Sequence, residues 1–319
     1  MLVNLDSYVG PAAGVATSVL WTFTSLLFTA AGKRIGATAV NATRIGLAIV
    51  LLGITHRWLA GGWVPHAAAG QVVFLALSGI VGLSIGDQAL LIAFVDIGPR
   101  LALLIMATAP ILAALFGRLV LGETLQPVAW LGMALSIGGV GWVVLERPHP
   151  ETAVRSAHRV RGTVLAFVGA ACQAGGLLLS KQGIGHGWLP RSEHLDPQAA
   201  ALVRMVFTGV GMVPIVALYL RQRRKRVAAG VPSLRMEARR AGLLFAVGGA
   251  VVGPYLGVWM SLVASDRAPL GVAQTLCSLA PVLILPFAAL VHKERIGRRA
   301  VLGAVVAVGG STLLFFNAT

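Results

Sequence analysis

Charged residues are scarce in this sequence of 319 residues, and acids are scarcer than bases. Only 12% of the residues are charged, with 11 Asp and Glu against 26 Lys and Arg, while 57% are hydrophobic. A soluble domain of this size needs more charge to cover its surface. The composition therefore predicts that a lipid bilayer surrounds most of the chain, as in a multi-pass protein of the plasma or inner membrane.

Cysteine is almost absent, and the motifs of several enzyme classes are missing. The two cysteines, Cys172 and Cys277, lie inside apolar runs, which favours small buried hydrophobic roles over a disulfide or a metal pair. The seven histidines fall in or beside predicted loops without ligand spacing, so neither a metal nor a cofactor is expected. Because a phosphate-binding glycine loop, Gly-x-Ser-x-Gly and His-Glu-x-x-His are all missing, neither an ATP-driven pump nor an enzyme is expected.

The net charge of +15 would suit nucleic acid, but the placement of the basic residues does not. Nearly all of them lie in short gaps between apolar runs, so no basic face is left for nucleic acid. The gaps after odd-numbered runs hold nineteen Lys and Arg, and the other gaps hold five. The positive-inside rule then predicts that the odd gaps are cytoplasmic and that both termini lie outside.

Ten apolar runs are long enough to cross about 30 Å of hydrocarbon as helices. No segment between them is large enough for a separate soluble domain, so the expected fold class is all-α integral membrane. The first run follows Asp6 without a basic leader, so it is expected to stay as a spanning helix. The runs are 11–31, 38–58, 71–94, 98–120, 127–145, 162–182, 198–220, 240–264, 269–290 and 297–316.

The chain repeats itself with an offset of 171 residues. This offset places Pro110 on Pro281 and the glycine pair 138–139 on the pair 309–310, and both pairs are expected to pack helices closely. Each half holds five predicted helices, an odd number, so the second half should enter the membrane from the opposite side. Such inverted-topology repeats are found in many secondary transporters. The expected division is a first repeat at 1–145, a basic linker loop at 146–161 and a second repeat at 162–319.

The repeated phrases resemble a known family. Residues 107–123, ATAPILAALFGRLVLGE, and 278–294, SLAPVLILPFAALVHKE, look like the fourth and ninth helices of EamA-type proteins of the drug/metabolite transporter superfamily. The segments LGMALSIGGVGW and LGAVVAVGGSTL, which follow, look like the fifth and tenth. The resemblance covers essentially the whole chain. It implies a ten-helix carrier of small metabolites with a central cavity between its halves.

Ionisable side chains inside apolar runs are costly and usually face the protein interior or a wet cavity. Arg44 and Asp87 lie at comparable depths in the second and third runs, so a buried ion pair is predicted. Two roles stay open for it: orienting two helices, or coupling to protons or substrate. Arg204 mirrors Arg44 in the second half, where snorkelling to the headgroups is favoured over binding an anionic substrate group.

Polar and aromatic side chains within the runs are candidates for lining a substrate cavity. Tyr255 and Trp259 share one helical face and Gln274 and Ser278 share another, each pair at a spacing of four. The alternative for each side chain is a contact with a neighbouring helix. The expected cavity residues are Trp21, Ser25, Asp87, Gln173, Tyr255, Trp259, Gln274 and Ser278.

The repeated prolines and glutamates have structural roles to predict. Pro110 and Pro281 are expected to kink their helices, as hinges near the substrate or as static bends. Glu123 and Glu294 fall at the membrane edge. Each is expected to cap, or complement the charge of, the N-terminus of the last helix in its half.

The expected function is secondary transport of a small organic metabolite, such as an amino acid or a drug-like compound, by alternating access. Export is the expected direction, while proton coupling through Asp87 and facilitated diffusion both stay open. The expected partners are a small-molecule substrate and the lipid bilayer. One alternative is an intramembrane enzyme acting on a lipid, which would need clustered acids or a His–acid pair near one interface. Another is a non-transporting scaffold, which would carry a larger soluble segment.

Overall fold

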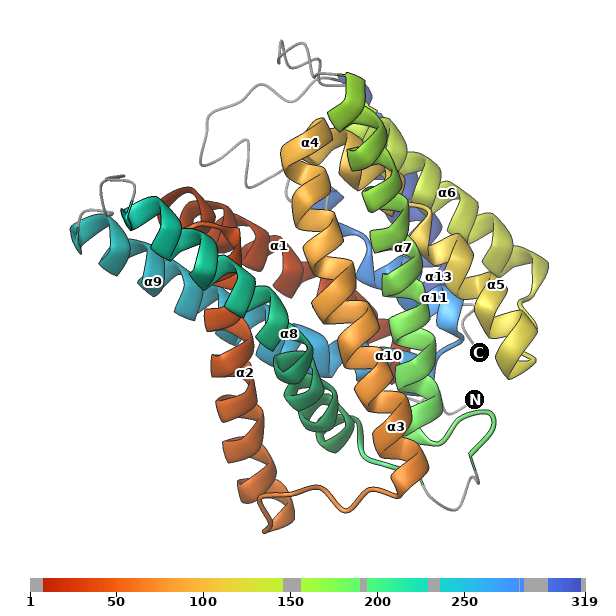
Figure 1. Cartoon of the computed structure of the whole chain (residues 1–319). Helices are drawn as coiled ribbons and strands as arrows, with labels where there is room; N and C mark the ends of the chain where they lie inside the picture. The colour runs from red at the N-terminus through yellow and green to blue at the C-terminus, as the bar shows by residue number, and fades with distance from the viewer. Residues whose placement is uncertain are drawn as a thin grey trace.

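The structure, a computed structural model, describes residues 8–145, 156–189, 194–228, 236–280, 282–283 and 298–316. These residues form helices joined by short loops, and no strand occurs among them (Figure 1). In chain order the helices are α1 (Val9–Ile35), α2 (Ala37–Ala60), α3 (Ala69–Ser78), the π-helix η2 (Gly79–Gly86), α4 (Asp87–Met106), α5 (Ala109–Leu121), α6 (Pro127–Leu145), α7 (Ser156–Ile184), α8 (Pro197–Ala228), α9 (Met236–Ala250), the π-helix η4 (Val251–Gly257), α10 (Val258–Arg267), α11 (Leu270–Cys277) and α13 (Arg298–Phe316).

The all-helical membrane fold agrees with the prediction from sequence. Six described helices are long and apolar enough to cross a membrane, judged by length and composition, and three shorter apolar helices accompany them. Helix α6 occupies the residues of the predicted run 127–145. The total of ten spans stays a prediction.

Two predicted boundaries differ from the structure. The gap expected at 95–97 is wrong, because α4 runs from Asp87 to Met106 and the helix breaks at residues 107 and 108 instead. The low hydropathy of Asp96 suggested a gap there. In the structure the Asp96 carboxylate is paired with Arg161 of α7, so this charged residue is accommodated inside α4. Helix α7 begins at Ser156, so residues 156–161 of the expected linker loop are helical.

Several contacts between a helix of the first half and a helix of the second have an equivalent contact in which the two halves trade roles. Helix α1 packs on α9 and α10, just as α7 packs on α3 and α4. Helix α2 pairs with α8, and α6 pairs with α13, so equivalent helices of the two halves meet each other. Figure 1 shows α6 and α13 together on one side of the molecule and α2, α8 and α9 on the other. These pairings are what a pseudo-two-fold axis between two similar halves requires.

The contact between α6 and α13 locates this axis. A Cβ on Gly139 would lie 2.4 Å from the Ala307 nitrogen, and one on Gly310 would lie 2.5 Å from the Ser136 nitrogen. The offset of 171 residues maps Gly139 onto Gly310 and Ser136 onto Ala307, so each of the two contacts corresponds to the other. Ser136 Oγ also donates a hydrogen bond of 3.3 Å to Ala307 O. The predicted close packing is therefore confirmed for one glycine of each pair.

Each half also carries a π-helix at the equivalent position. Helix η2 ends at Gly86 and η4 ends at Gly257, which lies 171 residues later. A π-helix widens the backbone locally and is frequent at functional sites. In the first half, Asp87 follows the π-helix directly.

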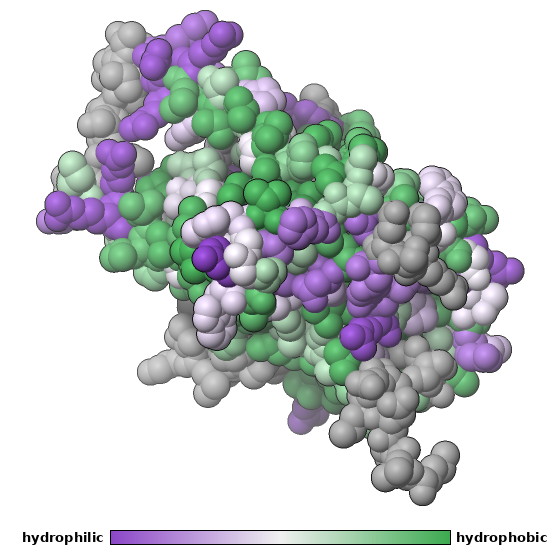
Figure 2. All heavy atoms as spheres, turned by 90° about the horizontal axis from the view of Figure 1, so that it is seen from below, coloured by the Kyte–Doolittle hydropathy of each residue, from purple (hydrophilic) through white to green (hydrophobic). Residues whose placement is uncertain are grey.

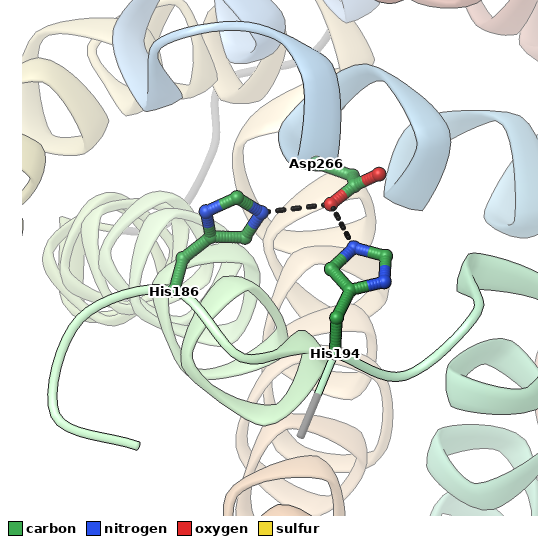
Figure 3. Close-up of side chains that lie close together, drawn as sticks. All are labelled: His186, His194 and Asp266. Atoms are coloured by element: carbon green, nitrogen blue, oxygen red, sulfur yellow. Dashed lines mark hydrogen bonds and ion pairs between the residues drawn. The ribbon is translucent and has the colours of Figure 1, made fainter. Parts of the chain in front are cut away.

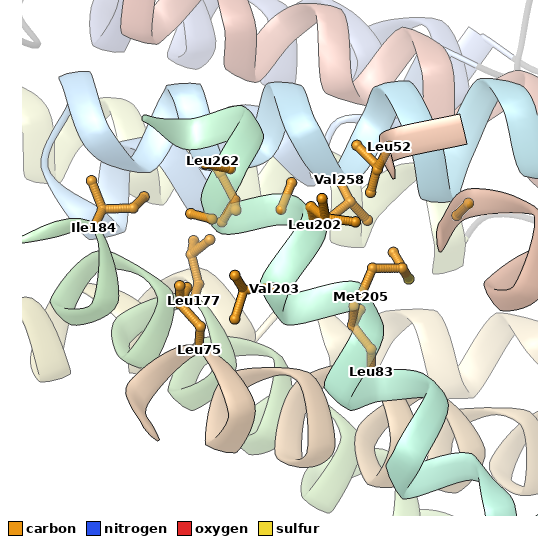
Figure 4. Packing of buried hydrophobic residues seen from close by; sticks show 14 of the residues in the cluster. Leu52, Leu75, Leu83, Leu177, Ile184, Leu202, Val203, Met205, Val258 and Leu262 are labelled. Carbon is orange, nitrogen blue, oxygen red and sulfur yellow. The ribbon is translucent and has the colours of Figure 1, made fainter. Parts of the chain in front are cut away.

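The largest buried apolar cluster joins the two halves. Leu52, Leu75 and Leu83 of the first half meet residues of α7, α8 and α10, including Leu177 and Leu262 (Figure 4). Seen from below, much of the surface is apolar, with hydrophilic side chains gathered in patches (Figure 2). Three exposed tryptophans lie near the α2–α3 and α7–α8 connections, as expected at a membrane–water interface: Trp58 in the last turn of α2, Trp63 and Trp188.

Candidate functional site: a cavity between the halves

A cavity of about 200 Å³ lies between the two halves. Helices α1, α4 and α6 of the first half and α7, α8, α10 and α11 of the second contribute to its wall. Pockets for drug-sized ligands are about 300–1,000 Å³. The cavity is below this range. Its polar or charged lining residues are Thr17, Trp21, Asp87, Ser136, Gln173, Arg204, Ser261, Gln274, Thr275 and Ser278.

Two equivalent helix breaks border this cavity. In the first half, Ile111 N and Leu112 N both donate to Thr108 O, at 3.1 Å each. In the second half, the nitrogens of residues 282 and 283 both donate to Leu279 O, 171 residues later. Residues at both breaks line the cavity. Broken helices at membrane depth are tolerated where they line a cavity, and in transporters they bind substrates.

The first break lies directly before Pro110. The predicted bend at Pro110 takes the form of a break, because α4 ends at Met106 and Pro110 lies in the first turn of α5. Its role as a hinge stays a prediction. At this position a proline costs little, since the nitrogen of the first turn has no partner within the helix. Pro110 lines the cavity. Pro281 lies outside the described residues.

Asp87 and Arg44 form the predicted ion pair. Arg44 also donates from Nε to Asn41 Oδ1 at 2.6 Å and lies over the ring of Phe28. Asp87 lines the cavity, whereas Arg44 is not among the lining residues. Arg44 is thus held by protein partners, and its charge is balanced by that of Asp87.

Arg204 differs from Arg44 in both position and pairing. Its expected snorkelling to the headgroups is wrong, since it is only 3% exposed and lines the cavity. Among the described residues, its Nε has no hydrogen-bond partner and no carboxylate forms a salt bridge with it. Asp87 attracts it electrostatically but is already paired with Arg44. In the second half the repeat in the sequence pairs Asp87 with about Gly257, and the ends of the two π-helices pair it with Val258; neither residue carries a charge. Among the residues that the structure describes, the guanidinium groups of Arg44 and Arg204 therefore have one carboxylate between them, and the positive charge of Arg204 is left unbalanced.

The remaining predicted cavity residues divide into two groups. Trp21, Gln173, Gln274 and Ser278 line the cavity. Gln274 and Ser278 are also joined, because Ser278 Oγ donates to Gln274 O at 2.8 Å. Ser25 lies in α1, and its side chain is outside the described part of the structure.

Tyr255 and Trp259 are not among the residues that line the cavity. Their rings do lie together, with centroids 6.3 Å apart, as their spacing of four suggested. The Tyr255 hydroxyl shares a hydrogen bond of 2.7 Å with Thr55 Oγ1, and both rings pack against the large apolar cluster. Their predicted role in substrate binding stays untested.

Four hydroxyl groups line the cavity without being among the expected cavity residues: Thr17, Ser136, Ser261 and Thr275. Thr17 precedes Trp21 by four residues, so the two share a face of α1. That spacing could have identified Thr17. No comparable signal distinguishes Ser136 or Ser261 from the other hydroxyls within apolar runs.

Glu123 caps a different helix from the one expected. Its Oε2 accepts a hydrogen bond of 2.7 Å from Leu270 N, at the start of α11, and its Oε1 pairs with Lys181 Nζ at 2.5 Å. Lys181 also donates to Ala268 O at 2.7 Å. The predicted capping of α6 is therefore corrected to capping of α11. Because Glu123 belongs to the first half and its partners to the second, it connects the two halves. Glu294 lies outside the described residues.

Comparisons with known proteins agree with this architecture. The model of one family, described as the EamA-like transporter family, matches residues 9–145 and 160–316. The comparison with curated proteins gave no match. One solved structure, described only as the crystal structure of a protein, superposes with a TM-score of 0.72 at 18% sequence identity, covering 97% of each chain. At this identity the likeness shows the fold alone.

Proposed function

Because the chain belongs to the EamA-like transporter family, we propose that it is a secondary transporter for a small organic metabolite that carries a carboxylate. The family and the apolar helices make it a multi-pass membrane protein of a transporter family. The carboxylate, the alternating-access mechanism, export, and the plasma or inner membrane as its location belong to the proposal.

The observation that carries the proposal is the unbalanced charge of Arg204 in a cavity lined by both halves. A buried charge without a partner is unfavourable, so a binding anion would relieve this cost. A guanidinium has its donors arranged as a fork that matches a carboxylate, which supports a carboxylate over a diffuse negative charge. Gln173, Gln274 and Ser278 supply neutral hydrogen-bonding groups for the rest of the substrate.

Alternating access would use the two helix breaks and two ion pairs that lie at opposite ends of α7. Arg161 of α7 holds Asp96 of α4 with two bonds of 2.7 Å. Lys181, at the other end of α7, holds Glu123 after α5. Each pair joins the first half to the second, so opening the cavity toward either side would require one pair to separate.

Asp87 is the proposed coupling group. Its protonation would remove the ion-pair partner of Arg44 and the carboxylate that attracts Arg204, which lines the cavity. A carrier for facilitated diffusion would work without this step. Transport measured with and without a pH gradient distinguishes the two mechanisms.

The experiment uses purified protein in proteoliposomes and a panel of labelled amino acids and other small carboxylates. The proposal expects saturable transport of at least one carboxylate, with the compound recovered unchanged. Recovery of a chemically altered lipid without transport would contradict it in favour of the intramembrane enzyme. That alternative needed a His–acid cluster, and the structure contains one at His186, His194 and Asp266, although none of the three lines the cavity.

A further inference from the structure

The loop between α7 and α8 brings two histidines to a buried acid at the end of α10. The Nε2 atoms of His186 and His194 lie 2.7 Å and 2.9 Å from the same oxygen, Oδ1 of Asp266. The two rings stand almost perpendicular, at 87°, and approach this oxygen from two directions (Figure 3). The expectation that the histidines form no ligand cluster is therefore wrong for these two.

We propose that His186, His194 and Asp266 form a binding site for a divalent transition-metal ion, with zinc as the best fit. Imidazole nitrogen with a carboxylate oxygen is a ligand set that zinc accepts, whereas magnesium and calcium prefer oxygen alone. The proposal rests on this cluster and is independent of the transport function.

The distances permit such a site after small movements. The three ligand atoms lie within 4.8 Å of one another. Zinc–ligand bonds of about 2.0–2.1 Å place tetrahedral ligand atoms roughly 3.3 Å apart. The two N–O distances would therefore lengthen by about half an ångström, and the two imidazole nitrogens, which lie within 4.8 Å of each other, would have to come to about the same separation, through rotation of the rings in the loop.

The charges and exposure around the cluster also fit. Arg267 Nε lies 3.3 Å from Asp266 Oδ2, so the second carboxylate oxygen is engaged and Oδ1 remains for the metal. The side chain of Asp266 is only 3% exposed, while those of His186 and His194 are 37% and 48% exposed. The acid is thus fixed by its surroundings and the histidines leave a path from solvent. The positive Arg267 opposes the metal, so the affinity should be below that of a closed four-ligand site.

A metal at this site would fasten the α7–α8 loop to the end of α10. Ala268, two residues beyond Asp266, accepts a bond from Lys181, the partner of Glu123. The site therefore lies beside the contact that joins the two halves. With three protein ligands, a fourth position would be left for water.

The test measures metal binding by the full chain, purified in detergent without a polyhistidine tag and stripped with a chelator. Equilibrium dialysis against zinc, followed by elemental analysis, should give about one zinc per chain, and zinc should raise the melting temperature. Magnesium should do neither, because it prefers oxygen ligands.

The informative variant is the double substitution His186→Gln and His194→Gln. Glutamine can still donate an N–H to Asp266, so the metal-free protein should keep its stability, but glutamine is a poor zinc ligand. Zinc affinity should fall at least about tenfold, since even outer partners of a metal contribute 10- to 100-fold. The matched control His66→Gln, in the α2–α3 loop, should bind zinc as the unaltered chain does. Zinc retained by the double variant, or no zinc bound by the unaltered chain, would overturn the proposal.

Discussion

Replacing Gly139 with alanine should destabilise the protein relative to the same replacement of its neighbour, Gly138. A Cβ at position 139 would lie 2.4 Å from the Ala307 nitrogen, whereas ordinary contacts begin at 3.4 Å, so α6 and α13 would have to separate by about 1 Å. The obstructing atoms belong to the backbone, which cannot rotate away. A Cβ at position 138 would meet nothing within 4 Å.

The comparison between the two variants isolates the cost of this clash. Both replacements gain about 1 kcal/mol from the higher helix propensity of alanine, and this gain cancels in the difference. Overpacking a close contact costs about 1–3 kcal/mol. Gly139→Ala should therefore be less stable than Gly138→Ala by about that amount. The pseudo-two-fold axis makes the same prediction for Gly310→Ala against Gly309→Ala, because Gly310 meets Ser136 at 2.5 Å and Gly309 is open.

The assay is denaturant-induced unfolding in detergent, followed by intrinsic tryptophan fluorescence. Equal stability of the alanine variants at 138 and 139 would refute the close approach of α6 and α13. A penalty at 139 without one at 310 would refute the symmetry between the halves.

Three further predictions concern buried charges. Arg44→Gln should lower the free energy of unfolding by up to about 3 kcal/mol, because Asp87 loses its ion-pair partner and keeps only the attraction of Arg204. Arg204→Gln should not destabilise the protein, because it removes an unbalanced charge, and equal losses of the two variants in denaturant unfolding would contradict this difference. Glu123→Gln should also destabilise the protein, because Lys181 loses its counter-charge, and the added replacement Lys181→Met should recover most of the lost stability. If the double variant unfolds at the same denaturant concentration as Glu123→Gln alone, the ion pair does not contribute as proposed. Asp87→Asn should abolish any stimulation of transport by a pH gradient while the protein still folds, and unchanged stimulation in proteoliposomes would exclude Asp87 as the coupling group.

Much of the fold follows from the sequence because lipid imposes long apolar runs and the repeat fixes which of them correspond. The bounds of α6 and the close approach of Gly139 and Gly310 were predictable for this reason. Pro110 predicted a bend near residues 107 and 108, but not that one helix would end there and another begin, because hydropathy records the length of an apolar run and not the direction of its backbone. Pro110 is compatible both with a kink and with the first turn of a new helix, and tertiary structure decides between them.

The candidate site was predictable where a charge had to be buried. Lipid excludes charge, so the sequence singled out Asp87, Arg44 and Arg204. Only the packed structure shows that Arg204, among the described residues, has no carboxylate in a salt bridge with it. The rotation of a helix that is apolar on all sides cannot be read from periodicity, so Tyr255 and Trp259 could not be placed. The histidine cluster stayed hidden because Asp266 follows His194 by 72 residues in the chain.

The measurement that tests the central claim most directly compares a carboxylate with its matching primary amide. Their uptake into proteoliposomes is measured for the unaltered chain, for Arg204→Gln and for Arg204→Lys. A charge-assisted contact contributes about 1.5–3 kcal/mol, so the unaltered chain should prefer the carboxylate by roughly 10- to 150-fold in kcat/KM. Arg204→Gln should lose this preference, and Arg204→Lys should keep part of it. Equal transport of both compounds by the unaltered chain, or a preference that survives in Arg204→Gln, would contradict the account.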